Sequence, residues 1–163
     1  MPRRKSKYNV SKDKQSRTYN DITFDSKMEM EYYRDVVLPA YNSGEITNFE
    51  LQKHFILQPR FRKDGGYVRP IEYVADFYIV DKEGKETIVD VKGMADATAK
   101  IKRKMVWYHY PDLNYLWLTY SKKYGGWVEY ERLQAYRRTE KKRQKEHRKL
   151  IKGEEIINVT ENN

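Results

Sequence analysis

Two aspartates and one lysine stand in the most apolar part of the sequence. Asp76 lies in YVADFYI, and Asp90 and Lys92 lie in TIVDVKG. On a strand, residues two positions apart project to one face, so Asp90 and Lys92 share a face while Val91 turns to the core. Neighbouring carboxylates repel each other unless a cation separates them, and Mg²⁺ prefers such oxygen ligands. With a lysine to hold a phosphate oxygen or orient a water, the pattern predicts metal-assisted hydrolysis at phosphorus.

The pattern also has a plain structural interpretation. An acidic residue two positions before a lysine is common in a chain with 35% charged residues, and it recurs at residues 83–85 and 140–142. Only the Asp90 triplet ends an apolar strand beside a second strand that carries its own aspartate. The alternative is that Asp76 and Asp90 mark solvent-facing or edge positions, or pair with lysines. The residues alone leave both interpretations open.

Glu29 is the third candidate carboxylate. It shares a helix face with Tyr33 and Val36, which should look toward a sheet, so it could reach a site centred there. Ser26 is a good N-cap three residues earlier, and this spacing is that of a capping box. Metal ligand and helix cap are therefore both open interpretations for Glu29.

The elements that would position these residues follow from the hydrophobic periodicity. A helix is predicted from Ser26 to Asn42, with Pro39 as a possible disturbance. The other predicted elements are a strand ending before Pro59, a turn at 64–66, hairpin arms at 71–80 and 87–92, a helix at 97–110, and strands at 113–121 and 127–130. This order predicts an α/β (α+β) domain with a mixed central sheet flanked by helices. The helix at 97–110 should form a right-handed crossover, which makes the strand at 113–121 parallel to the Asp90 strand.

Basic residues follow the acidic cluster in two helices. In the first, an apolar stripe of Ile101, Met105 and Tyr108 is predicted to pack on the sheet, and the basic residues would contact phosphates on either side of the site. The second is a long basic helix with too few apolar residues to pack fully, so we expect it to bind the DNA backbone or to become ordered on DNA. The alternative for the first helix is a solvated face, and the alternative for the second is a solvated, partly disordered tail. The candidate DNA-binding residues are Lys100, Lys102, Arg103, Lys104, Arg137, Arg138 and Lys141.

Composition limits the classes of function. The 163 residues carry a net charge of +9 and no cysteine, and they contain no apolar run of membrane-spanning length. With a pI near 9.5, the chain favours a polyanionic partner, and its tyrosine-rich, sheet-like segments favour nucleic acid over a membrane surface. The predicted organisation is a flexible basic arm at 1–22, one folded domain at 23–130, a basic helix at 131–152 and a tail at 153–163. A cytoplasmic location is expected, since no secretory signal is visible.

These residues resemble a known family. Asp76, followed by Asp90-Val91-Lys92-Gly93 at the end of the next strand, is similar to the core motif of the PD-(D/E)XK nucleases, and the Ser26-x-x-Glu29 helix resembles the first helix of that superfamily. The closest resemblance is to small phage-encoded endonucleases akin to Holliday junction resolvases, over about Phe24 to Trp127. Two departures are that Ala75 replaces the proline often found before the first aspartate, and that aspartate stands at 90 where many relatives have glutamate.

The resemblance implies a restriction-endonuclease-like core over residues 23–130 and Mg²⁺-dependent hydrolysis of DNA, with Mn²⁺ as a substitute. It implies Asp76, Asp90 and Glu29 as metal ligands and Lys92 as the catalytic lysine. Gln52 lies in a family-like position and would orient a water or phosphate, unless it is simply a polar residue on the exposed face. Branched DNA such as the Holliday junction is the expected substrate, in phage-type recombination or replication within the bacterial host cytoplasm.

Two other functions compete with this one. Resolving a junction takes two coordinated cuts, so the nuclease hypothesis predicts a homodimer. A non-catalytic DNA-binding module, such as a degenerate nuclease, is the main alternative, and an RNA-binding or ribosome-associated protein is the third. Neither alternative needs the acidic cluster, and an idle cluster of buried charge is costly.

Overall fold

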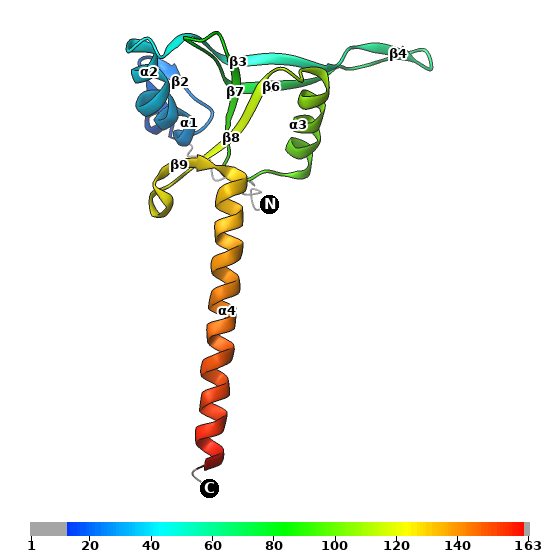
Figure 1. Ribbon diagram of the computed structural model, residues 1–163. Coiled ribbons are helices and arrows are strands. Elements are labelled where there is room, and N and C mark those ends of the chain that lie inside the picture. Colours follow the sequence, from blue (N-terminus) through cyan, green and yellow to red (C-terminus); the bar gives the residue numbers. More distant parts are fainter. Residues whose placement is uncertain (1–12, 162–163) are drawn as a thin grey trace.

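A five-stranded mixed sheet forms the centre of the protein (Figure 1). The structure is a computed structural model that describes residues 13–161, with side chains up to residue 151. The strands, in their order across the sheet, are β3 (Ile46–Gln58), β6 (Ile71–Asp81), β7 (Glu86–Val91), β8 (Asn114–Ser121) and β9 (Gly126–Glu129). Only the β7–β8 pair is parallel. The predicted α+β fold with a mixed sheet and flanking helices is confirmed.

The predicted hairpin and crossover surround the site. β6 and β7 pair in an antiparallel ladder, and their turn is closed by Asp81, whose Oδ1 accepts from the backbone N–H groups of Glu83 and Lys85. Helix α3 (Ala97–His109) then carries the chain to β8, which lies parallel to β7 as predicted. This connection places the end of β7 next to the loop that leads into α3.

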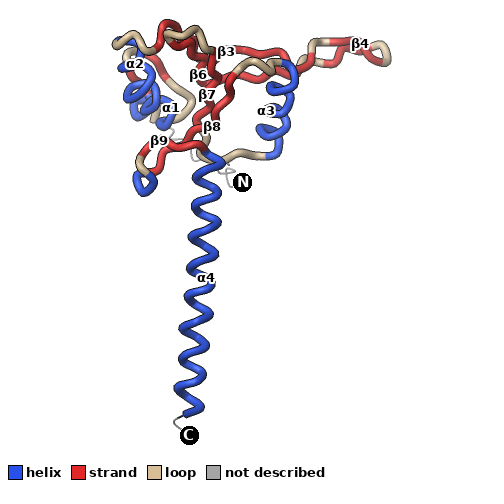
Figure 2. The backbone as a smooth tube through the Cα atoms, viewed as in Figure 1, coloured by secondary structure: helices blue, strands red, loops and turns tan. Residues whose placement is uncertain are grey.

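Helices cover the two faces of the sheet (Figure 2). The N-terminal helical segment consists of α1 (Lys27–Tyr32), the π-helical turn η2 (Tyr33–Val37) and α2 (Leu38–Asn42), and it packs on one face through Met30, Tyr33 and Val37. On the other face α3 packs through Val106, which is fully buried. Each helical layer thus closes its own hydrophobic core against the same sheet.

The buried side of α3 differs from the prediction. Ile101 is 60% exposed and Tyr108 is 82% exposed, whereas Val106 is buried and Met105 half-buried. The predicted stripe of Ile101, Met105 and Tyr108 is therefore wrong. Two long basic side chains on the inner side of α3 account for the difference: Lys102 reaches a backbone carbonyl of β6, and the Arg103 guanidinium stacks on an indole ring.

The N-terminal segment is more ordered than predicted. Residues 13–23 include the short helix η1 (Gln15–Arg17) and the strands β1 (Thr18–Tyr19) and β2 (Ile22–Thr23), which pair with each other. Tyr19 makes an edge contact with the Tyr33 ring, with centroids 6.3 Å apart. The prediction of a flexible arm is wrong for residues 13–22, because aromatic contacts hold this hairpin on α1 and η2. Residues 1–12 of that arm lie outside the described residues.

Two elements extend away from this body in Figure 1. A small hairpin of β4 (Phe61–Lys63) and β5 (Gly66–Val68) continues from β3 and β6. Helix α4 (Tyr130–Glu161) follows β9, which is joined to β8 by η3 (Lys122–Tyr124). The helix was predicted to end at 152 and leave a tail, but its backbone stays helical to Glu161. Among the described residues, no helix has the length and apolar character needed to cross a membrane.

Candidate active site

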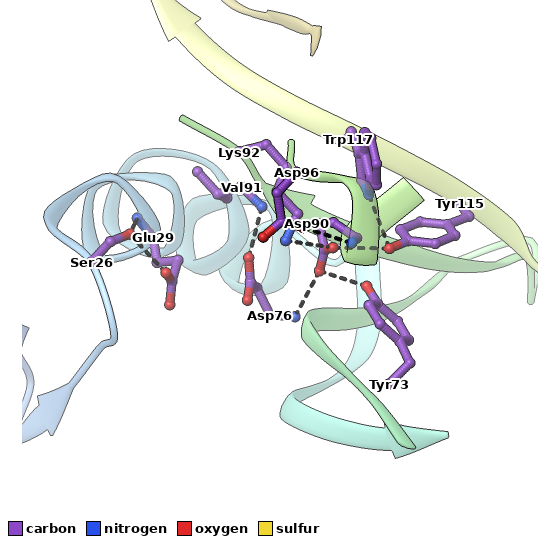
Figure 3. Close-up of polar contacts among 11 residues, drawn as sticks. Ser26, Glu29, Tyr73, Asp76, Asp90, Val91, Lys92, Asp96, Tyr115 and Trp117 are labelled. Carbon is purple, nitrogen blue, oxygen red and sulfur yellow. Dashed lines mark hydrogen bonds and ion pairs between the residues drawn. The ribbon is translucent and has the colours of Figure 1, made fainter. Parts of the chain in front are cut away.

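The two aspartates meet where β6 and β7 separate. The last pair of their ladder is Phe77 with Val89, so Asp76 and Asp90 occupy the next positions along the two strands. Val91 donates its backbone N–H to Asp76 Oδ2 at 2.8 Å, and the Asp76 backbone N lies 3.4 Å from Asp90 Oδ1. The predicted neighbourhood of Asp76 and Asp90 is confirmed (Figure 3).

A change of facing along β6 explains why the strands separate there. Tyr73 and Ala75 belong to the core under α3, whereas Phe77 and Ile79 belong to the core under α1. These odd-numbered residues would share one face on a regular strand. The alternation therefore reverses at Asp76, which frees its carboxylate to turn toward the end of β7.

Gln52 lies on the neighbouring strand at the same level. It falls between the register pairs Leu51–Phe77 and Lys53–Ala75, opposite Asp76, and its φ of +53° is a left-handed conformation that non-glycine residues seldom adopt. The facing of β3 also reverses here, since Leu51 packs with the α1-side core and Phe55 with the α3-side core. The Gln52 side chain is exposed, which fits a polar residue on the exposed face, and its role in orienting a water or phosphate stays a prediction.

Asp90 is the most enclosed group of the site. It is 1% exposed, and its oxygens accept from the hydroxyl groups of Tyr73 at 2.5 Å and Tyr115 at 2.9 Å. Trp117 donates its indole N–H to the Tyr115 hydroxyl at 2.9 Å, which fixes the direction of that hydroxyl. Burial, followed by the repulsion of a second negative charge near Asp90, raises the pKa of both tyrosines, so they remain donors.

Lys92 stands beside Asp90, as predicted. It follows the end of β7, its backbone N–H donates to the Leu118 carbonyl at 2.7 Å, and its Nζ lies 2.8 Å from Asp90 Oδ2. The side chain is 23% exposed, so the ammonium lies at the boundary between Asp90 and solvent. Burial disfavours the charged ammonium, but the attraction of Asp90 and then Asp76 outweighs it and raises the pKa of Lys92. Lys92 therefore stays protonated at neutral pH.

Glu29 takes part in the helix cap and also faces the site. Ser26 Oγ accepts from the Glu29 backbone N–H and donates to Glu29 Oε1 at 2.7 Å, while Oε2 accepts from the Asp25 backbone N–H at 3.3 Å. The residue is 6% exposed, and burial raises the pKa of its carboxyl, while the positive charge of Lys92 acts in the opposite direction. The cap is therefore present, and it holds the carboxylate within electrostatic range of Lys92.

The cluster of Glu29, Asp76, Asp90 and Lys92 carries more negative than positive charge. Burial, then the neighbouring charges of Asp90 and Glu29, raise the pKa of Asp76 to about 8. With every group ionised, three carboxylates and one ammonium sum to a charge of −2. One divalent cation would supply the two positive charges that the fully ionised cluster lacks in this buried environment.

The donor chemistry fits a hard divalent cation, although the side chains do not yet surround one. In the described part of the chain, no three acidic or histidine side chains are grouped closely enough to enclose an ion. Among the described residues, Asp76 Oδ2 accepts only the Val91 N–H, whereas Asp90 accepts two tyrosine hydroxyls and contacts the Lys92 ammonium. Asp76 is therefore the carboxylate with the most free lone pairs.

A cavity of about 370 Å³ opens beside Asp90, on the side of α3. Asp90, Lys92 and Lys102 contribute its charged groups, together with Asp96, whose carboxylate caps α3 by accepting the Ala99 N–H at 2.8 Å. Lys102 donates to the Glu72 carbonyl at 2.6 Å. The rest of the lining is Tyr73, Val74, Met94, Thr98, Ala99 and Tyr115.

The predicted basic residues have separate environments. Lys100 and Lys104 are exposed on α3, and Lys102 lines the cavity. Arg103 differs from the prediction, because its side chain is only 13% exposed and pairs with Glu131, while its guanidinium lies 4.2 Å from the Trp117 ring centroid. The guanidinium thus helps fix the start of α4. The predicted residues Arg137, Arg138 and Lys141 are exposed along α4.

The sequence interpretation did not include Tyr73 and Tyr115. Both lie in apolar strand segments, and a buried tyrosine needs a partner for its hydroxyl. Asp90 is likewise flanked by buried residues and needs donors. A buried tyrosine on each of the two strands that flank the strand of a buried aspartate is the signal that identifies this set.

Most of the chain matches the model of one known protein family. A family model described as "Protein of unknown function (DUF1064)" matches residues 5–126, which include Glu29, Asp76, Asp90 and Lys92 and exclude α4. No curated protein and no solved structure matches the chain. Since the match covers more than half of the sequence, the chain belongs to the DUF1064 family.

Proposed function

We propose that the protein is a Mg²⁺-dependent DNA endonuclease. The observation that carries this proposal is the buried cluster at the β6–β7 fork, where three carboxylates share one lysine, so that full ionisation would leave two negative charges without compensation. A carboxyl group with a strongly raised pKa, such as Asp76, is common at catalytic sites, and its neighbour Asp90 lines a cavity. The net charge of +9 supports a polyanionic substrate.

Asp76 and Glu29 would hold the cation, with Asp90 as the third ligand once the Lys92 ammonium moves off its Oδ2. A bound divalent cation would activate a water and offset charge on the phosphate. Tyr73 and Tyr115 keep Asp90 oriented, as groups hydrogen-bonded to metal ligands commonly do.

Lys92 is the group of this chain that would contact the reacting phosphate. Its ammonium is protonated, lies at the edge of the cavity and can donate to a phosphate oxygen as charge develops there. In the hydrolysis, a bond forms between the water oxygen and phosphorus, and the bond to the 3′ oxygen breaks. The products are a 3′-hydroxyl and a 5′-phosphate, with the leaving oxygen taking up a proton.

The two basic helices would extend the substrate surface beyond the cluster. Lys100 and Lys104 are exposed on α3, and α4 starts beside the loop after Lys92, where the Ala95 backbone N–H donates to the Tyr130 hydroxyl at 3.2 Å. Exposed basic residues on α4 would reach the DNA backbone farther from the cut. Branched DNA, as in phage-type recombination in a bacterial cytoplasm, is the substrate we propose, with a homodimer making two cuts.

The test is a cleavage assay on labelled four-way junction, flap, single-stranded and linear duplex DNA. The wild-type protein, Asp76→Asn and the control Glu83→Gln are compared in Mg²⁺ and in EDTA. An asparagine at 76 keeps the acceptor for the Val91 N–H, so the fold should survive, and Glu83 is an exposed residue of the β6–β7 turn. We expect cutting in Mg²⁺ by the wild type and the control only. Sedimentation of the protein with its preferred substrate tests the dimer.

A non-catalytic DNA-binding protein is the second candidate. It is favoured by the enclosure of Asp90, whose contacts with Tyr73, Tyr115 and Lys92 would also suit a purely structural ion pair. This function predicts tight DNA binding and no cutting of any substrate in Mg²⁺ or Mn²⁺. It also predicts that Asp76→Asn changes neither property.

A further inference from the structure

The hairpin of β4 and β5 is a slender, well-defined projection. We refer to residues 59–70 as the ribbon. Its register pairs are Phe61–Val68, Arg62–Tyr67 and Lys63–Gly66, and Asp64 and Gly65 form its two-residue turn with φ values of +49° and +79°. Positive φ at both turn positions is the type I′ geometry that matches the twist of paired strands. In Figure 1 the ribbon extends from the end of β3 and the start of β6, away from α4.

The ribbon is strongly basic and carries its charge on exposed side chains. Arg60, Arg62, Lys63 and Arg69 are all exposed, and Asp64 at the tip is the only acidic residue in 59–70, which leaves a net charge of +3. Among the described residues, none of these four cations has a carboxylate within ion-pair distance, in contrast to Arg103 and Lys123. Their charge is therefore available to a partner.

One face of the ribbon is organised around Tyr67. The guanidinium carbon of Arg60 lies 3.9 Å from the Tyr67 ring centroid, and that of Arg62 lies 5.2 Å away. Tyr67 itself is 60% exposed, and Phe61, which is next to both arginines in sequence, is 42% exposed. Stacking on a ring uses the flat face of a guanidinium and leaves the N–H groups at its edge free for phosphates or base edges.

The shape of the ribbon selects the partner. A two-stranded β-ribbon fits the major groove of B-form DNA, whereas the major groove of duplex RNA is too deep and narrow. β6 connects the ribbon to the acidic cluster, since Ile71 at the base of the ribbon is five residues from Asp76. At about 3.3 Å per residue this separation is roughly 16 Å, or about half a turn of DNA, so one duplex can reach both.

We propose that the ribbon binds in the major groove of the DNA duplex beside the cleavage site, with the Arg60 and Arg62 guanidinium groups contacting the nucleic acid. The proposal rests on the proposed function in taking DNA as the substrate. It adds a third basic surface, distinct from α3 and α4, and assigns this surface to the major groove of the DNA.

The test measures binding without cutting. Fluorescence anisotropy in EDTA compares a labelled DNA duplex with an RNA duplex of the same sequence, for the wild type and Arg60→Gln/Arg62→Gln. The control Lys82→Gln/Lys85→Gln removes two exposed charges from the turn at the other end of β6. We expect the arginine variant to bind the DNA duplex about tenfold or more weakly and to lower the salt slope by about two. The RNA duplex should lose less affinity, and the control should bind DNA as the wild type does.

Three outcomes would overturn the proposal. They are unchanged DNA affinity of the arginine variant, an equal loss in the lysine control, or an equal loss on RNA. Methylation of guanine N7 by dimethyl sulfate then reports the groove directly, because N7 lies in the major groove. Protection of N7 by the wild type, lost in the arginine variant, supports the placement, and its absence with the wild type contradicts it. A wild-type protein that binds DNA but never cuts would remove the nuclease while leaving these binding results interpretable.

Discussion

Asp90 and Arg103 are two enclosed charges on the same side of the sheet, and their charges are balanced in different ways. The Arg103 guanidinium pairs with Glu131 and stacks on the Trp117 ring, so its charge is balanced locally. Asp90 has its own partner in Lys92, but Asp76 and Glu29 share that lysine. The comparison teaches that burial of a charge does not by itself mark a reactive site. An uncompensated excess of one sign is what distinguishes the cluster on which the proposed activity rests.

The largest effect should come from the lysine that three carboxylates share. Lys92→Gln keeps a hydrogen-bond donor near Asp90 but removes the positive charge that would stabilise the reacting phosphate. We expect cleavage to slow by about a hundred- to a thousandfold. Single-turnover cleavage at saturating Mg²⁺ measures this, with Lys85→Gln in the exposed turn as the control. An unchanged rate would place Lys92 outside the reaction.

The next effect concerns the hydroxyl groups that hold Asp90. Tyr73→Phe/Tyr115→Phe leaves the rings in place but removes two donors, so Asp90 is less well fixed and less well solvated. Changes of this kind cost about ten- to a hundredfold in metal affinity or activity. Tyr124→Phe, which removes a hydroxyl paired with Glu140 far along the chain, is the matched control. Cleavage by both variants at the wild-type rate would contradict the positioning role.

Arg103 should behave in the opposite way to its neighbour Lys104. Arg103→Gln removes the ion pair and the stacking on Trp117, so we expect the free energy of unfolding to fall by about 1 to 2 kcal/mol. Lys104→Gln should leave the stability unchanged, weaken DNA binding severalfold and lower the salt slope by about one. Denaturant unfolding and anisotropy together separate the two residues. If both variants changed only DNA binding, the comparison between a structural and a ligand-binding charge would fail.

The last prediction is a dependence of stability on pH. The folded pKa of Asp76 is about 8, above the value of about 4 in the unfolded chain, so the folded state binds the extra proton between these values. The free energy of unfolding should therefore fall as the pH rises from about 4 to about 8 in EDTA. Asp76→Asn should flatten this part of the curve, as measured by urea unfolding at a series of pH values. A wild-type curve that rises over this range would contradict the shifted carboxyl.

Much of the fold was predictable because the periodicity is strong. The β6–β7 hairpin, the crossover through α3 and the pairing of Asp76 with Asp90 all follow from apolar strands separated by clear turns. The buried face of α3 was not predictable, because basic side chains with long apolar stems can replace apolar residues there, as Lys102 and Arg103 do.

The residues that form the candidate site were easier to predict than the backbone geometry that positions them. Glu29, Asp76, Asp90 and Lys92 could be chosen from their flanking residues, but the reversal of facing at Asp76 depends on the backbone of two adjacent strands. The left-handed conformation of Gln52 has no signal in its own sequence, because glutamine does not favour it. Tertiary pairing sets these features, and local propensity does not.

The proposed function requires that a divalent cation binds Glu29, Asp76 and Asp90 and replaces the proton that Asp76 carries at neutral pH. Isothermal titration calorimetry with Mg²⁺ at pH 7, repeated in buffers of different ionisation enthalpy, tests it without DNA. Because Asp76 is largely protonated at this pH, binding should release up to about one proton from the wild type and none from Asp76→Asn. Binding by the wild type with this proton release is the predicted result. The absence of Mg²⁺ binding, or equal binding by the two proteins, would contradict the account.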